Sequence, residues 1–304
     1  MKIGFGAALW MRDYNLPGLH KMLDELAMLR CDGVELHFPY IFDAYESRPA
    51  YLKELLAIHG LELASVFTRT NFATAETLEK SIERDLRMMD FLAAMGGKNV
   101  LLDDDYSVNG NFYLKRPWPE DIDGRISELA DIANRLGEEA RQRGMQLAWH
   151  QHWGTLFESP ENFDKFMQKT DASLVGFCPD TAQLKLCGYD EVACIEKYAD
   201  RVTYVHFKDV ERRWNKRTLW DGMEVPTDTG GYNVDSFGRM VELGRGEVNF
   251  PAIAEILRKA GFDGWIIDDF DYTGYRTYDS CKACIDYMNN ALGVYGERQL
   301  KKEN

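Results

Sequence analysis

The feature of this sequence that most constrains its fold is a regular alternation between short apolar runs of strand length and longer segments of helical spacing. Such alternation is typical of βα units built on a parallel sheet. Glycines end several of the helical segments, as a left-handed C-cap before a tight turn requires, namely Gly60, Gly96, Gly144 and Gly261. We predict strands over residues 2–10, 32–38, 61–68, 99–104, 146–152, 174–180, 202–209 and 264–271.

Eight such units in a chain of 304 residues are the number expected of an α/β protein of the (β/α)₈ TIM-barrel type. An open, doubly wound sheet is the alternative, but no GxGxxG motif follows the first predicted strand and the repeat continues through eight units. No Pro/Gly/Ser-rich linker interrupts the pattern. We therefore predict that residues 1–304 form a single TIM-barrel domain.

One connection is much longer than the others. Residues 211–249 form the loop between the seventh strand and the seventh helix, and they carry Trp214, Trp220, Tyr232 and Phe237. Long loops in compact domains are usually functional, and the loops that follow barrel strands lie on the active face. We predict that this segment is a lid over the site. An oligomer contact is a compatible alternative, so a homo-oligomer stays open.

Charge and hydropathy exclude some classes of partner. The net charge of −14 would repel the phosphate backbone of nucleic acids and anionic bilayers. The N-terminus does not resemble a signal peptide, and no run approaches the length of a membrane span. We expect a cytoplasmic protein with no nucleic-acid or membrane partner. The single CxxC, Cys281 and Cys284, is interpreted as a packed helical face rather than a redox or metal site.

Polar residues close most of the predicted strands. In a barrel the carboxyl ends of the strands open into one mouth, so these side chains are the candidates for chemistry. They are Glu35 and His37, Asp103 to Asp105, His150 to His152, Asp180 with Gln183, His206 with Lys208 and Asp209, and Asp268, Asp269 and Asp271.

Histidine placement points to a metal. Four of the six histidines, His37, His150, His152 and His206, fall at predicted strand ends. Two histidines and two carboxylates that converge on one rim suit Mn²⁺, Fe²⁺, Co²⁺ or Zn²⁺, and the residues alone do not choose among these ions.

Strand alternation indicates which of these strand-end residues share a face of their strand. His206 and Lys208 share one face of their strand, and His150 and His152 share one face of theirs. On the last strand a face with Asp269 looks into the barrel, which leaves Asp268 towards the helices. This favours Asp269 as the ligand.

The motifs that carry these residues resemble the xylose-isomerase-like barrel superfamily of sugar isomerases and epimerases, and within it the inosose dehydratase-like branch. The resemblance rests on WHQHWGTLFESPENFDKFM, FCPDTAQL, YADRVTYVHFKDV and GRGEVNFPAIAEILRKAGFDGWIID, and it is thinner before residue 98. The family holds one divalent ion with one residue from each of strands five to eight. Carried over, these metal ligands are His150, Asp180, His206 and Asp269. Mn²⁺ is the first expectation, with Co²⁺, Fe²⁺, Zn²⁺ or Mg²⁺ as alternatives.

Three positions depart from the family pattern. Sugar epimerases of the superfamily have Glu where this chain has His150 and Asp269, so the shorter Asp269 could act through water or yield to Asp268. Where the family usually reads D-T-x-H, this chain has Gln183, which removes a histidine from the substrate pocket. These departures bear on the metal set and on the substrate.

The resemblance implies removal of an α-proton from a keto-sugar or keto-polyol, with a metal-stabilised enediolate as the product of that step. The catalytic candidates are Lys208, which could neutralise the oxyanion, and the acid/base candidates His152 and Glu35; Glu35 could equally be a buried structural carboxylate. The candidates for substrate binding are Trp10, His37, Phe67, Trp153 and Gln183.

Several functions remain open at this point. The first is a metal-dependent isomerase, epimerase or dehydratase that acts on a sugar or an inositol ketone. A lyase that cleaves 3-keto-glycosides would use the same enediolate. An abasic-site endonuclease is disfavoured by the acidic charge and by the absence of the histidines that a multi-metal cluster needs. A non-catalytic sugar-binding barrel is the alternative that Gln183 and Asp269 keep open.

Overall fold

The computed structural model describes residues 1–10, 16–37, 40–70, 75–104, 107–108, 111–115, 119–211, 239–271 and 273–301. Parallel strands form an eight-stranded sheet in the order β8-β7-β4-β3-β2-β1-β12-β9. Bridges from Phe177 to Val202 and from Asp180 to His206 connect β8 with β9, so the sheet closes on itself. The strands are β1 (Lys2–Gly6), β2 (Gly33–His37), β3 (Glu62–Thr70), β4 (Asn99–Asp104), β7 (Gln146–His150), β8 (Val175–Cys178), β9 (Tyr204–Phe207) and β12 (Trp265–Asp268).

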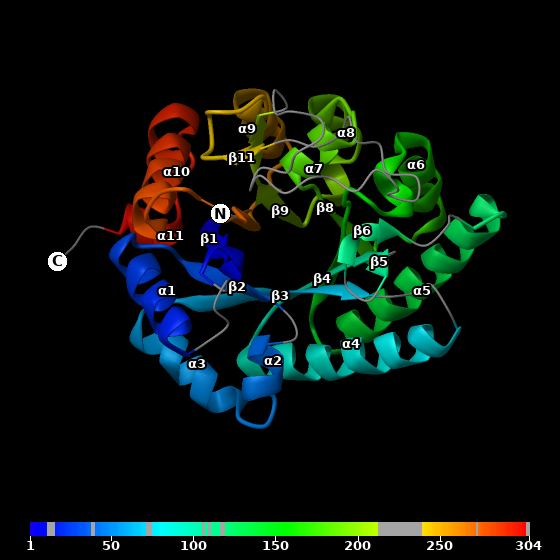
Figure 1. Ribbon diagram of the computed structural model, residues 1–304, viewed down its shortest axis with the longest axis horizontal. Coiled ribbons are helices and arrows are strands. Elements are labelled where there is room, and N and C mark those ends of the chain that lie inside the picture. Colours follow the sequence, from blue (N-terminus) through cyan, green and yellow to red (C-terminus); the bar gives the residue numbers. More distant parts are fainter. Residues whose placement is uncertain are drawn as a thin grey trace.

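Helices surround these strands (Figure 1), and the predicted (β/α)₈ barrel is confirmed. They are α1 (Leu16–Met28), α2 (Tyr40–Tyr45), α3 (Pro49–Ile58), α4 (Ala75–Met95), α5 (Ile122–Gln142), α6 (Pro160–Lys169), α7 (Thr181–Leu186), α8 (Glu191–Lys197), α9 (Phe250–Lys259), α10 (Thr277–Leu292) and α11 (Glu297–Leu300). None of the helices in the described ranges is long and apolar enough to span a bilayer.

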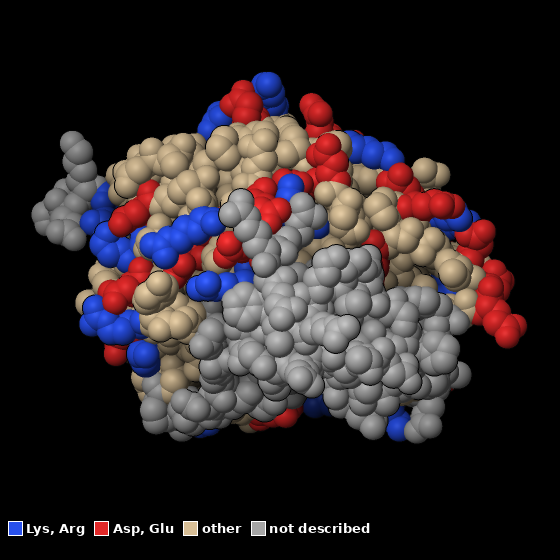
Figure 2. Space-filling model, turned by 45° about the horizontal axis from the view of Figure 1, so that its top comes forward, with Lys and Arg blue, Asp and Glu red and all other residues tan. Residues whose placement is uncertain are grey.

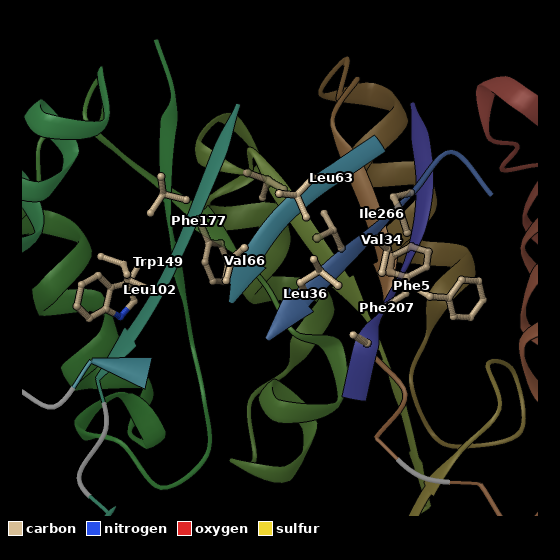
Figure 3. Close-up of a cluster of buried hydrophobic side chains, with 14 of the residues drawn as sticks. Phe5, Val34, Leu36, Leu63, Val66, Leu102, Trp149, Phe177, Phe207 and Ile266 are labelled. Carbon is tan, nitrogen blue, oxygen red and sulfur yellow. The ribbon is translucent and has the colours of Figure 1, made fainter. Parts of the chain in front are cut away.

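Side chains of the strands divide into two buried layers, because successive residues of a strand point to opposite faces. The outward layer packs against the helices and includes Phe5, Val34, Leu36, Trp149, Phe177, Phe207 and Ile266 (Figure 3). A separate inward cluster fills the barrel with Ala64, Phe67, Leu101, Ala148, Cys178, Tyr204, Trp265 and Ile267. The residues that alternate with the outward ones therefore point into the barrel. At the carboxyl ends of the strands, this alternation directs polar side chains into the mouth of the barrel.

The four glycines predicted to end helices all adopt the left-handed conformation, with φ from 68° at Gly60 to 85° at Gly96. This confirms the predicted caps, because such a φ is costly for any residue with a Cβ. Cys281 and Cys284 lie buried and unbridged in α10, so the packed-face interpretation of the CxxC is also confirmed.

Most of the predicted strands run too long at their carboxyl ends, whereas β3 continues to Thr70, two residues past its predicted end, and β4 ends as predicted. β1 ends at Gly6, where a 3₁₀ turn over Ala7–Leu9 replaces the predicted continuation, and β7 ends at His150 rather than at residue 152. The backbone leaves the ladder at these points, so several of the candidate residues lie just beyond their strands. A hairpin of β5 (Ser107–Val108) and β6 (Asn111–Lys115) was also not predicted.

The long connection after the seventh barrel strand begins and ends as a short antiparallel pair, β10 (Asp209–Glu211) with β11 (Arg239–Val241). Within the predicted lid of residues 211–249, this pair places Glu211 next to Arg239. Residues 212–238, with Trp214, Trp220, Tyr232 and Phe237, lie outside the described residues.

Candidate metal centre and active site

The four residues expected to hold a metal come from four neighbouring strands. His150 is the last residue of β7 and His206 belongs to β9, whereas Asp180 follows β8 by two residues and Asp269 follows β12 directly. Trp149, Phe207 and Ile266 of these strands face the helices, so their alternating neighbours point into the mouth.

His150, Asp180 and His206 form a compact group in which one ligand atom of each lies within 4.8 Å of the others. Asp180 Oδ2 is 3.5 Å from His150 Nε2 and 3.9 Å from His206 Nδ1. The other carboxylate oxygen of Asp180 accepts the backbone N–H of Gln183 at 2.9 Å and caps α7. The cap fixes the carboxylate so that Oδ2 points at the two imidazoles.

Asp269 lies beside this group rather than within it. Its Oδ2 is 3.6 Å from His206 Nδ1, and one oxygen of Asp269 lies within 4.8 Å of ligand atoms of Glu35 and His37. Asp268 points away from the mouth towards Cys284 of α10, and burial raises the pKa of Asp268 to about 7. Strand alternation thus selects Asp269, and not Asp268, as the carboxylate of the mouth.

Lys208 brings a buried positive charge to the centre. Its Nζ lies 2.8 Å from Asp269 Oδ2, 2.7 Å from Asp271 Oδ2 and 3.8 Å from Asp180 Oδ2. Burial opposes the charge, but these carboxylates outweigh it and raise the pKa of Lys208 well above its ordinary value. In turn Lys208 and His206 hold the pKa of Asp269 well below its ordinary value, despite burial. Lys208 is therefore a fixed ammonium group.

The two histidines of the compact group differ in their electrostatic surroundings. Burial lowers the pKa of His150, so this ring is neutral. Burial also opposes a charge on His206, but Glu35, Asp269 and Asp180 together raise the pKa of His206 to about 9. In the metal-free protein His206 therefore carries a proton that a metal ion would have to displace.

His152 lies at the rim, with its ring centroid 5.5 Å from that of His150. Its Nδ1 donates to the carbonyl of Trp153 at 2.5 Å, so the lone pair of the neutral ring is on Nε2. The backbone N–H of Trp153 donates to Gln183 Oε1 at 3.2 Å. His152, Trp153 and Gln183 therefore form one connected segment of the rim.

Phe67 lies at the centre of the mouth. Its ring centroid is 5.0 Å from that of His150, 5.6 Å from that of His37 and 6.2 Å from that of His206, each in an edge-on arrangement. Trp10, in contrast, is not brought to the centre. Its indole N–H donates to Glu25 of α1, since the strand ends at Gly6 and the chain turns outward before residue 10.

Three residues near the centre had no role assigned from the sequence, although Asp271 was among the strand-end candidates. Gly6 allows Asp269 to approach, because a Cβ at residue 6 would lie 2.7 Å from Asp269 Oδ1. Asp271 pairs with Lys208, and the Tyr204 ring packs 5.8 Å from that of His206. The signal in the sequence was strand alternation, which puts residue 271 on the same face as residue 269, and residue 204 on the same face as residue 206. Nothing in the sequence marks Gly6.

The donor set suits a divalent ion. Buried polar atoms are normally hydrogen-bonded, yet His206 Nδ1, Asp180 Oδ2 and Asp269 Oδ1 have no hydrogen-bond partner among the described residues. Two imidazoles with carboxylates are typical ligands of Mn²⁺, Fe²⁺, Co²⁺ and Zn²⁺, and three protein ligands leave coordination positions open, as catalytic sites require.

Comparison with known proteins agrees with this architecture. The sequence profile described as "Xylose isomerase-like TIM barrel" matches residues 23–272. The chain is 29% identical over 276 residues to inosose dehydratase of Lacticaseibacillus casei, with 88% of each chain covered.

Two solved structures share the fold at low sequence identity. The IolI protein, solved with a bound zinc atom, superposes with a TM-score of 0.71 at 15% identity and covers 98% of this chain and 100% of its own. A xylose isomerase-like TIM barrel protein from Mycobacterium smegmatis, solved with magnesium, has a TM-score of 0.71 at 19% identity and covers 96% of both chains. The family match extends over most of the barrel, and the chain belongs to the xylose isomerase-like TIM barrel family.

Proposed function

We propose that this protein is a metal-dependent dehydratase of a cyclic keto-polyol of the inosose kind, working by proton abstraction next to the carbonyl. The observation that carries the proposal is the convergence of His150, Asp180 and His206 with Asp269 and Lys208 in the mouth of the barrel. The relative from Lacticaseibacillus casei that bears the name inosose dehydratase supports the choice of substrate.

His150, Asp180 and His206 would hold the ion, with Asp269 as the fourth ligand directly or through water. A divalent ion in this position supplies a Lewis acid for the carbonyl oxygen of the substrate. Mn²⁺ is the first ion to test. Zn²⁺ and Mg²⁺ are the next, because structural neighbours were solved with zinc and with magnesium.

His152 is the proposed base. A base must be neutral, must carry a lone pair towards the substrate and must be reachable from the mouth. The hydrogen bond from Nδ1 to the Trp153 carbonyl leaves the lone pair of His152 on Nε2, and His152 is only partly buried at the rim. It would take the proton from the carbon next to the carbonyl and return it to the hydroxyl of the following carbon, which leaves as water.

Lys208 would neutralise negative charge that develops on the substrate oxygen. Its ammonium group is buried and held by Asp269 and Asp271, so it needs no reorganisation when that charge appears. Phe67 would pack against the apolar face of the ring, while His37 and the Gln183–Trp153 segment would contact its hydroxyl groups. Trp10 is not part of this proposal, because its indole is bonded to Glu25.

Charge separates this function from nuclease activity on the same fold. Lys and Arg side chains are interspersed with Asp and Glu over the described part of the face in Figure 2. The net charge is −14, so long-range attraction of a phosphate backbone is not expected.

The proposal is tested by incubating the Mn²⁺-loaded protein with 2-keto-myo-inositol, a ketohexose and a 3-keto-glucoside, with ¹H NMR as the readout. We expect loss of water from the inosose, and only slow turnover of the other two. His206→Ala should abolish both the bound metal and the turnover. Isomerisation of the ketohexose without dehydration of the inosose would replace the proposed reaction by an epimerase or isomerase, and release of the aglycone would replace it by a lyase.

A further inference from the structure

A buried ion pair crosses the interior of the barrel from Glu35 to His206. Glu35 belongs to β2 and His206 to β9, with β1 and β12 between them in the sheet. Glu35 Oε2 lies 3.1 Å from His206 Nε2, and the exposed fractions of the two side chains are 0% and 1%. The imidazole is therefore held from across the barrel and not by its own strand.

This contact determines which nitrogen of His206 faces the candidate metal centre. Nε2 is directed at Glu35, so Nδ1 is on the side of Asp180 and Asp269, at 3.9 Å and 3.6 Å. Nδ1 has no hydrogen-bond partner among the described residues. When the carboxylate accepts Nε2–H, the lone pair of the neutral ring is on Nδ1, which is the tautomer that a metal ligand needs.

Burial argues against the alternative that Glu35 is the base. A base must come within hydrogen-bond distance of the substrate proton, directly or through one water molecule. Glu35 is fully buried and one of its oxygens is engaged by His206, whereas His152 is partly exposed at the rim.

We propose that Glu35 is a positioning residue that accepts Nε2–H of His206 and thereby makes Nδ1 the metal-ligating atom. Carboxylates that hold a ligating histidine in this way fix the orientation of the ring and increase its basicity. The inference rests on the metal centre of the proposed function, but its test does not depend on turnover.

Metal affinity is the first readout. Glu35→Gln keeps the size of the side chain but removes the charge, and we expect it to weaken Mn²⁺ binding by about 10- to 100-fold in a titration against a competing chelator. Glu35→Asp keeps the charge on a shorter side chain and should restore part of the affinity. It also provides the test if the glutamine variant does not fold, as judged by circular dichroism.

Glu191→Gln is the matched control. Glu191 is likewise a buried carboxylate with a cationic partner, Lys185 Nζ at 2.9 Å, but it lies in α8 and contacts none of the proposed ligands. This control should bind Mn²⁺ as the wild type does, even if its unfolding temperature falls.

The protonation state of the ring is the second readout, and a loss of general stability would not mimic it. In the zinc-loaded, ¹⁵N-histidine-labelled protein we expect His206 to show a slowly exchanging Nε2–H and a zinc-bound Nδ1, with the Nε2–H signal shifted in Glu35→Gln. Coordination of the metal through Nε2 would overturn the inference but not the proposed function. So would an affinity of Glu35→Gln for Mn²⁺ within twofold of that of the wild type. A wild-type protein that binds neither ion would overturn the proposed function together with it.

Discussion

Gly6 is the residue at which the smallest change should reach the candidate metal centre. A Cβ at this position would lie 2.7 Å from Asp269 Oδ1, so Gly6→Ala should displace that carboxylate while the barrel stays folded. We expect kcat/KM to fall by about 10- to 100-fold, since displacements of about 1 Å can have effects of this size. Gly274→Ala is the control, because a Cβ there meets nothing within 4 Å, and its activity should equal that of the wild type.

His206 should make metal binding dependent on pH. Its carboxylate neighbours raise its pKa to about 9, although burial opposes this, so below that pH a metal ion must displace one proton. Affinity should therefore rise with pH, by about tenfold per unit between about pH 6.5 and pH 8.5. Titrations of Mn²⁺ at three pH values measure the slope, and an affinity that is constant over this range would show that no such proton is displaced.

The direction of a single side chain was predicted best from the sequence where the residue lies on a regular strand. Alternation aimed His206 into the mouth and separated Asp269 from Asp268, because both strands keep their pleat up to these residues. It misplaced Trp10, because the chain leaves the strand at Gly6 and the alternation stops there. The pairing of Glu35 with His206 joins residues 171 positions apart and has no local signal.

Among the elements, the short ribbon of β10 and β11 is organised by a single carboxylate. Asp209 accepts the backbone N–H groups of Val210 and Gly246 at 2.9 Å and 2.8 Å, and those of Gly244 and Val248 at 2.9 Å and 3.2 Å. Asp209→Asn would place an amide N–H₂ against two of these donors. We expect the free energy of unfolding to fall by about 2–4 kcal/mol.

Urea unfolding of Asp209→Asn measures this loss, with the exposed Asp131→Asn as a control that should change stability by less than about 0.5 kcal/mol. Equal stability of the two variants would mean that the four hydrogen bonds do not hold the base of the segment 212–238. The lid predicted over residues 211–249 remains a prediction from the sequence.

Strands with a clear apolar run were the ones that the sequence predicted. All eight barrel strands were found because each carries an apolar run that is buried on both faces, as parallel strands require. The β5–β6 hairpin and the β10–β11 ribbon were not found, since their strands are only two to five residues long. Most strand ends were placed too far along the chain because polar residues that leave the ladder look like a continued alternation.

For the whole molecule, bound metal should act as a cross-link between strands that are far apart in sequence. His150 belongs to β7, Asp180 lies two residues beyond β8, and His206 belongs to β9; these strands are neighbours where the barrel closes. A ligand at about 100 times its dissociation constant adds about 2.7 kcal/mol to the free energy of unfolding. We therefore expect Mn²⁺ to raise the unfolding temperature of the chelator-treated protein by about 5 °C.

Differential scanning calorimetry with and without Mn²⁺ tests this expectation. His206→Ala should unfold at the same temperature under both conditions, since it lacks a ligand. If the wild type also showed no shift, the three residues would not form a metal site under those conditions.

The fold as a whole was the most predictable level, because the eightfold repeat allows few ways to bury its apolar faces other than a closed barrel. Metal identity and substrate were not predictable, since His150, Gln183 and Asp269 depart from the family pattern at positions that we propose contact the metal or the substrate.

Exchange of the α-proton tests the central claim most directly, because every version of the proposed chemistry begins with its removal. The protein would be incubated with 2-keto-myo-inositol in D₂O, with Mn²⁺ or after chelator treatment, and followed by NMR. We predict that deuterium enters the carbon next to the carbonyl, or that the substrate loses this α-proton together with the hydroxyl of the following carbon as water, only in the Mn²⁺-loaded wild type and not in His206→Ala. A metal-loaded protein that neither exchanges this proton nor dehydrates the substrate would contradict the account.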